Sequence, residues 1–285
     1  MGFVIAALGA TIACHAEKPR VQKHLPQELP PNVERIGSIQ DPRITESSGG
    51  VASRRHPGVL WTHNDGNKPG SYMLFAMDRS GKSLGNFRVT GATLHDWEDI
   101  AIDNEGHLYV GDIGNNDARR FTIAVHEINE PDPKLSGTTV AVNRSWTLQF
   151  AKMPFDCESL FVWDGFGYVI SKVFDDQKAE IYRFPLTNSI KPITLEKVAQ
   201  LKIESPVTGA DISADGKLLG LVARSGAYVY KVNGDIGRTA KTKFIHTRFK
   251  HEHVEGCCFV PDGLLATAET REIFLFTDPA FHPAK

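Results

Sequence analysis

Short runs of apolar residues, bounded by polar and turn residues, recur along this chain and predict β-strands. Turn residues separate the runs, for example HPG at 56–58, NEG at 104–106 and DG at 215–216. No long stretch repeats apolar residues with the 3.6-residue period of an amphipathic helix. The pattern therefore predicts an all-β chain.

A similar short motif precedes an apolar strand pattern five times. The motifs are ITESSGGVA at 44–52, DWEDIAID at 96–103, DCESLFVW at 156–163, PVTGADIS at 206–213 and HVEGCCFV at 253–260. Their anchor residues, spaced by 52, 60, 50 and 47 residues, are Glu46, Glu98, Glu158, Thr208 and Glu255. A repeat of this length built from short strands is typical of a β-propeller with one four-stranded blade per repeat. We expect an all-β, five-bladed β-propeller.

The last repeat is too short to supply four strands. Only 30 residues follow Glu255, and folded proteins avoid leaving a bare sheet edge. The strand pattern VERIGSI at 33–39 fits the missing outer strand. We therefore expect the N-terminal strand to close the last blade, and residues 33–285 to form a single β-propeller domain.

The segment before this domain predicts export. Residues 1–14 are apolar, small and uncharged, but too few to span a bilayer. We interpret 1–16 as a signal or lipoprotein-type segment and 17–32, rich in Pro, Lys and Gln, as a tether. A lipid anchor at Cys14 and cleavage after Ala16 are the two alternatives. The expected location is the periplasm or the cell surface, with membrane contact only through Cys14.

Composition narrows the range of partners. Apolar residues make up 41% and charged residues 23% of the chain, and the net charge is -2. This balance predicts a globular monomer with no general affinity for nucleic acid. The four cysteines do not have the spacing of a zinc site. A small molecule or a protein is the expected ligand.

Ring closure would bring distant acidic residues to one channel mouth. Residues two apart in a strand share a face, so Asp96, Asp156 and His253 should accompany three of the anchor glutamates. The second strand of each repeat runs back to the same mouth. The residues at these strand ends are Asp65, Asp112, Lys172, Arg224 and Glu269.

So many converging carboxylates cannot all stay ionised without a partner, and oxygen-only clusters suit calcium. The predicted metal ligands are Glu46, Glu98, Asp156, Glu158 and Glu255. The predicted ligand-binding residues are Asp65, Asp112, Lys172, Thr208, Arg224 and Glu269. The alternative is structural, with each repeated glutamate accepting backbone N–H groups of a neighbouring blade.

Several phrases of the sequence resemble a group of exported bacterial propellers. They are ESSG at 46–49, LWTHNDG at 60–66, DWEDIA at 96–101, VGDIGNN at 110–116 and VTGADIS at 207–213. More distantly, the chain is similar to phytase-like, NHL and WD40-type propellers. The resemblance spans roughly 44–275 and implies a propeller and export. Phytase-like propellers bind calcium through acids at the channel mouth, but the basic residues that phytate requires are missing here apart from Lys172 and Arg224.

Three functions are consistent with these features. The first is a binding protein whose acidic, calcium-binding mouth holds a small ligand or a protein partner. The second is a calcium-dependent hydrolase of a phosphoester, lactone or glycoside, with His253 or Asp96 as the catalytic base. The third is a structural platform without a ligand.

Overall fold

The computed structural model describes residues 28–66, 72–93, 95–174, 177–203, 206–251 and 253–283. The predicted signal or lipoprotein segment 1–16, with Cys14, lies outside the described residues, as does most of the predicted tether 17–32. Within the described part, no helix has the length and apolar character needed to cross a bilayer.

The regular secondary structure of the described chain is almost entirely β-strand, which confirms the all-β prediction. The strands of the first half are β1 (Val33–Ser38), β2 (Ser47–Ala52), β3 (Leu60–Asn64), β4 (Met73–Met77), β5 (Ser83–Thr90), β6 (Trp97–Ile102), β7 (His107–Asp112), β8 (Thr122–Asn129) and β9 (Thr139–Gln149). Those of the second half are β10 (Cys157–Trp163), β11 (Phe166–Ser171), β12 (Glu180–Pro185), β13 (Ile193–Thr194), β14 (Glu196–Gln200), β15 (Val207–Ile212), β16 (Leu218–Ala223), β17 (Gly226–Lys231), β18 (Phe244–Arg248), β19 (Val254–Val260), β20 (Gly263–Ala268) and β21 (Glu272–Phe276). Three short 3-10 helices are η1 (Pro133–Leu135), η2 (Ile236–Ala240) and η3 (Pro279–Phe281).

Three of the sheets have four strands each. Their strand orders are β10-β11-β12-β14, β15-β16-β17-β18 and β1-β21-β20-β19. In the last sheet, β1 pairs antiparallel with β21, and Val33 lies opposite Phe276. The prediction that the N-terminal strand completes the C-terminal sheet is therefore confirmed.

The remaining sheet is larger than the sequence predicts. It has nine strands. The parallel pairing of β5 with β9 joins strands β2 to β5 with strands β6 to β9, and β13 adds the ninth strand by pairing with β9. The cause is the length of β9. Residues 142–149 of β9 pair with β8, residues 139–141 pair with β5, and residues 148 and 149 also pair with β13. One long outer strand thus connects three successive parts of the chain.

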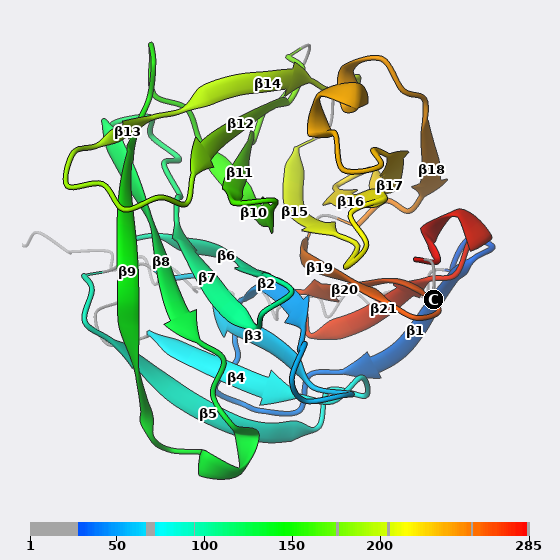
Figure 1. The fold of residues 1–285 in the computed structure, drawn as a ribbon. Coiled ribbons are helices and arrows are strands. Elements are labelled where there is room, and N and C mark those ends of the chain that lie inside the picture. The colour runs from blue at the N-terminus through cyan, green and yellow to red at the C-terminus, as the bar shows by residue number, and fades with distance from the viewer. Residues whose placement is uncertain are drawn as a thin grey trace, which may run out of the picture.

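Five strands, each the first of a group of consecutive antiparallel strands, form a closed ring. β2 contacts β6, β6 contacts β10, β10 contacts β15, β15 contacts β19, and β19 contacts β2. We call these the inner strands. Figure 1 shows them near the centre, with β5, β9, β14, β18 and β1 at the periphery. The fold is therefore a propeller-like all-β arrangement.

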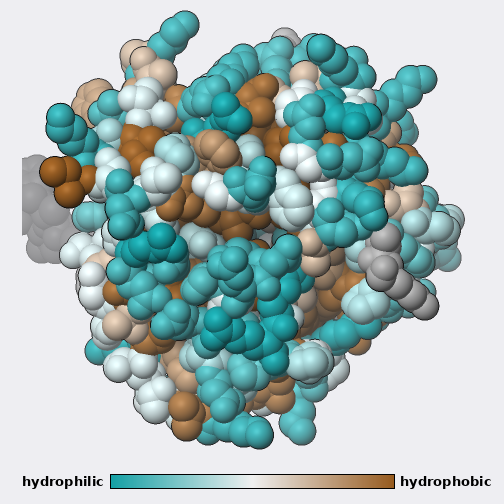
Figure 2. All heavy atoms as spheres, in the orientation of Figure 1, coloured by the Kyte–Doolittle hydropathy of each residue, from teal (hydrophilic) through white to brown (hydrophobic). Residues whose placement is uncertain are grey.

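Apolar side chains fill the spaces between neighbouring sheets. Trp61, Trp97 and Phe87 are fully buried in one cluster, and Trp146 and Phe184 in the next. Each such side chain contributes about 1.5–3 kcal/mol when it is removed from water. Outside these layers the face in Figure 2 is mostly hydrophilic. The packed ring gives the inner strands fixed positions, and these strands carry the repeated acids.

Candidate metal and ligand site

Four inner strands have a β-bulge at the anchor residue. The pairing of each inner strand with its neighbour skips one position, which is Glu98, Glu158, Thr208 or Glu255. A bulged residue stays out of the ladder and its side chain is re-aimed. The three glutamates of this group line one pocket. The bulge is therefore the local feature that directs the repeated acids to a common site.

The first inner strand has a different register from the one that the sequence suggested. The Asp65 N–H donates to the Glu46 carbonyl (2.8 Å), as the Glu269 N–H donates to the His253 carbonyl (2.9 Å). Glu46 is thus equivalent to His253, two residues ahead of an anchor position. Ser48 occupies the anchor position, and Ser48 rather than Glu46 lines the pocket. The assignment of Glu46 as an anchor residue was wrong by two positions.

The pocket has a volume of about 320 Å³ and draws side chains from every run of strands. Its lining residues are Ser48, Asp65, Glu98, Asn116, Glu158, Lys172, Arg224, His253, Glu255 and Glu269. We call it the acidic pocket. The sequence had suggested all of these residues except Ser48 and Asn116.

Two carboxylates of the acidic pocket, those of Asp65 and Glu98, and the carboxylate of the neighbouring Asp96 are close enough to share a cation. Oxygens of Asp65, Asp96 and Glu98 all lie within 4.8 Å of one another. Gly114 packs directly on this group, since a Cβ at Gly114 would overlap the carboxylates of Asp96 and Glu98. Calcium binds oxygens at about 2.3–2.6 Å. Two oxygens on opposite sides of a calcium ion are therefore separated by about twice that distance, which is close to the 4.8 Å limit of this group.

Crowding of these acids raises their pKa values. Burial is the main cause for Glu98, whose pKa is well above its usual range, followed by the charges of Glu158, Asp65 and Asp96. Burial and the Asp65 charge raise the pKa of Asp96 to about 6. Burial and the charge of Glu46 raise the pKa of Asp65. A cation at this group would favour all three ionised forms.

Two buried carboxylate oxygens in the pocket have no hydrogen-bond partner among the described residues. They are Oδ1 of Asp65 and Oε2 of Glu158. The other oxygen of Glu158 forms an ion pair with Lys172. Buried acceptors are normally satisfied, so these two oxygens leave capacity for a ligand or an ion.

The pocket also holds basic side chains. Nδ1 of His253 lies 2.9 Å from Oε2 of Glu269. The Arg224 guanidinium lies over the ring of Phe174 at 5.4 Å, and the Lys172 ammonium lies near the same ring at 5.9 Å. The pocket therefore combines carboxylates with basic groups.

Three of the predicted site residues are engaged in backbone contacts outside the pocket lining. Asp112 accepts the Asp96 N–H (2.8 Å) and forms an ion pair with Arg120 (3.0 Å). Asp156 accepts the Asn115 N–H (2.7 Å). The Thr208 hydroxyl donates to the Val254 carbonyl (2.6 Å).

These contacts give the three residues a positioning role. Asp112 pairs with Arg120 near the end of the loop that carries Gly114, and Asp156 accepts the N–H of Asn115 next to Gly114. Thr208 connects two inner strands. The loop in turn covers the three-carboxylate group, so both acids support the site without lining it.

The structural alternative was that inner-strand acids accept backbone N–H groups of a neighbouring inner strand. Such bonds occur, but their acceptors are Asp99 and Asp211 rather than the repeated glutamates. Asp99 accepts the Leu160 N–H (2.7 Å), and Asp211 accepts the Phe259 N–H (2.8 Å). Each bond joins two neighbouring inner strands. Sequence reasoning missed both residues, although an acid inside an apolar inner-strand run was a usable signal, because a buried acid requires a partner.

No protein-family model matches the chain, and no curated protein matches it. Among solved structures, the chain is similar to hydrazine synthase of Kuenenia stuttgartiensis, with a TM-score of 0.44 and 9% sequence identity. The match covers 78% of this chain and 69% of that chain. A likeness at this level assigns neither a family nor an activity, so the functional argument rests on the acidic pocket itself.

Proposed function

We propose that this chain is an exported, five-bladed β-propeller that binds calcium and, next to it, a small ligand or a protein partner in the acidic pocket. The nine-stranded sheet would then be two blades joined edge to edge by β5 and β9. Export is supported by the apolar pattern of residues 1–16.

The observation that carries the proposal is the group formed by Asp65, Asp96 and Glu98. Their oxygens lie within 4.8 Å of one another, and Oδ1 of Asp65 is buried with no hydrogen-bond partner in the described part of the chain. The donors are all carboxylate oxygens, which suit a hard cation such as calcium rather than zinc. Without a cation, three converging carboxylates repel one another in a site that is shielded from water.

Bound calcium would supply positive charge and free coordination positions, because it takes six to eight oxygens and the chain offers three carboxylates here. Those positions suit water or the oxygens of a ligand. Lys172 and Arg224 line the same pocket and can orient an anionic group of that ligand.

Hydrolysis is the second candidate function, and the His253–Glu269 pair favours it. Glu269 orients the imidazole of His253 through a 2.9 Å contact at the same pocket. A histidine held in this way can act as a general base toward water. Phosphoesters, lactones and glycosides are the substrate classes to test, each with and without calcium.

Calorimetric titration of calcium into chelator-treated protein tests the proposal. We expect one saturable binding event that is abolished in Glu98→Gln and retained in Asp117→Asn. Asp117 is a matched control, because it lies on the same loop as Gly114 and is 73% exposed. Absence of calcium binding by the wild-type protein would overturn the proposal.

Turnover distinguishes the two candidate functions. Calcium-dependent hydrolysis of any test substrate that is lost in His253→Gln would establish the enzyme. Calcium binding without turnover of any substrate would support the binding protein over the hydrolase.

A further inference from the structure

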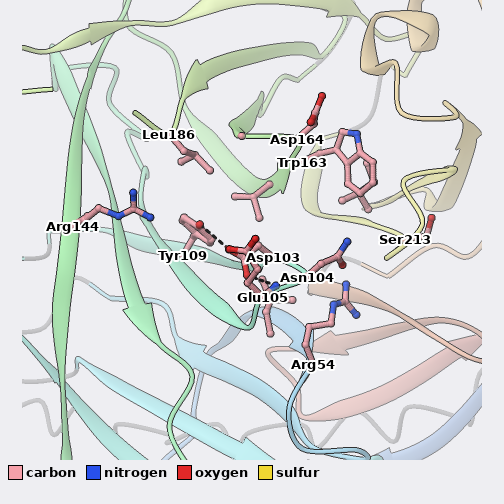
Figure 3. A pocket seen from close by; sticks show the side chains of 14 residues that line it. Arg54, Asp103, Asn104, Glu105, Tyr109, Arg144, Trp163, Asp164, Leu186 and Ser213 are labelled. Carbon is pink, nitrogen blue, oxygen red and sulfur yellow. Dashed lines mark hydrogen bonds between the residues drawn. The ribbon is translucent and has the colours of Figure 1, made fainter. Parts of the chain in front are cut away.

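A second and larger pocket, of about 490 Å³, lies at the other end of the inner strands. The acidic pocket is built where inner strands begin, whereas this one is built where they end, at the turns into the next strand. We call it the turn pocket. Figure 3 shows side chains from several turns facing it, including those of Arg54, Asn104, Asp164 and Ser213.

The main acceptor of the turn pocket is already satisfied within the protein. The Asp103 carboxylate accepts the N–H groups of Glu105 (2.9 Å) and His107 (2.8 Å). It also contacts Nδ1 of His107 (2.9 Å) and accepts the Tyr109 hydroxyl (3.0 Å). The close grouping of Asp103, Glu105 and His107 is therefore explained by the turn that it stabilises, without a metal ion.

Unlike Asp103, Arg54 has a hydrogen-bonding group that is not satisfied. Its Nε is buried and has no hydrogen-bond partner among the described residues. Its charge acts on Asp211, but the Asp211 carboxylate accepts the Phe259 N–H at 2.8 Å. A buried donor without a partner is costly, so a ligand that brings an acceptor to Arg54 would be stabilised.

One part of the wall is apolar, beside the polar residues Asn104, Glu105, Arg144, Asp164 and Ser213. It includes Ile102, Val162, Leu186 and Ile212, and Trp163 forms one side. The indole of Trp163 packs against Gly216, where a Cβ would overlap its ring. The aromatic wall is thus held in place by the neighbouring turn and offers a rigid surface for a flat group.

We propose that the turn pocket binds a small molecule of about one or two rings that carries an oxyanion. Arg54 supplies the unsatisfied donor, and a planar guanidinium pairs with a carboxylate or a phosphate through two parallel bonds. The ring of the ligand packs against Trp163. The volume lies within the range of about 300–1,000 Å³ of small-molecule sites.

Three probes that share one ring test this proposal: benzoate, phenyl phosphate and the neutral benzyl alcohol. A charge-assisted hydrogen bond predicts that at least one of the two anions binds at least about tenfold more tightly than benzyl alcohol. Their relative affinities distinguish a carboxylate ligand from a phosphate ligand. Arg54→Gln removes the preference for the anion, whereas Trp163→Leu weakens all three probes and keeps the preference. Arg35→Gln, a change at an exposed arginine of β1, leaves every affinity unchanged.

Indole N–H resonances locate the binding. The chain has four tryptophans, and Trp61, Trp97 and Trp146 are at most 1% exposed. We expect the probes to shift the Trp163 resonance. We expect this shift to be the same in the presence of calcium and in the presence of chelator. The unchanged resonances of the other three tryptophans in Arg54→Gln show that this variant is folded.

Three results would overturn the proposal. They are no binding of any probe at millimolar concentration, equal affinity for both anions and benzyl alcohol, and an anion preference that survives in folded Arg54→Gln. None of them depends on calcium, so failure here is distinguishable from failure at the acidic pocket.

Discussion

Glu158 forms an ion pair with Lys172 through one of its two carboxylate oxygens, while the other oxygen is buried with no hydrogen-bond partner among the residues that the structure describes. Glu158 belongs to an inner-strand bulge and Lys172 follows the neighbouring strand β11. Burial raises the pKa of Glu158 to about 7 against the opposing effect of Lys172. Lys172 therefore offsets part of the negative charge that the carboxylates give to the acidic pocket.

Replacement of Lys172 by methionine should destabilise the protein at pH 8. Removing one member of a buried ion pair leaves an uncompensated charge, at a cost of about 3 kcal/mol. Urea unfolding measures this cost. The double variant Lys172→Met, Glu158→Gln should recover most of the lost stability, because no buried charge is then left alone. Equal stability of the single variant and the wild type would show that the pair is unimportant.

Replacement of Gly114 by alanine should lower calcium affinity at least about tenfold, since an added methyl group overlaps the Asp96 and Glu98 carboxylates and must displace them. Calcium titration measures the effect. Gly50→Ala is a matched control, because the nearest atoms to a Cβ there lie at 3.8 and 3.9 Å, an ordinary contact distance. Unchanged calcium affinity in Gly114→Ala would place the cation elsewhere.

The sequence was sufficient to predict the β-class, the strand pattern and the closure by the N-terminal strand. Each depends on short-range periodicity or on counting strands. The same is true of the convergence of Glu98, Glu158 and Glu255, because their spacing reflects the repeat.

The sequence was not sufficient where register decides the outcome. Glu46 and Ser48 both match the motif by composition, and only the pairing with β3 shows which one occupies the anchor position. The parallel β5–β9 pairing was also unpredictable, since it depends on how far β9 extends beyond β8. Neither feature leaves a periodic signal in the chain.

Replacement of Asp99 by alanine should separate stability from calcium binding. The Asp99 carboxylate accepts the Leu160 and Ile100 N–H groups at 2.7 and 2.8 Å. Leaving a buried N–H without an acceptor costs about 1–3 kcal/mol each. Urea unfolding should show this loss while the calcium dissociation constant stays unchanged, because Asp99 does not line the pocket. A parallel loss of calcium affinity would mean that Asp99 also positions the cation site.

The pH dependence of stability provides a test of Glu255. Burial and then the Glu158 charge raise the pKa of Glu255 from 4.5 to about 9. Between these values the folded protein holds a proton that the unfolded chain releases, so the free energy of unfolding falls as pH rises. Glu158 contributes in the same sense up to about pH 7.

The interval from pH 7 to pH 9 therefore isolates Glu255 from Glu158. We expect chelator-treated protein to lose stability across this interval in urea unfolding, and Glu255→Gln to show a shallower decline. Other buried groups with raised pKa values are the carboxyls of Glu98 and Asp99 and the thiols of Cys157, Cys257 and Cys258, but they are present in both proteins. Identical slopes in wild type and variant would therefore show that Glu255 is already ionised in the folded state at neutral pH.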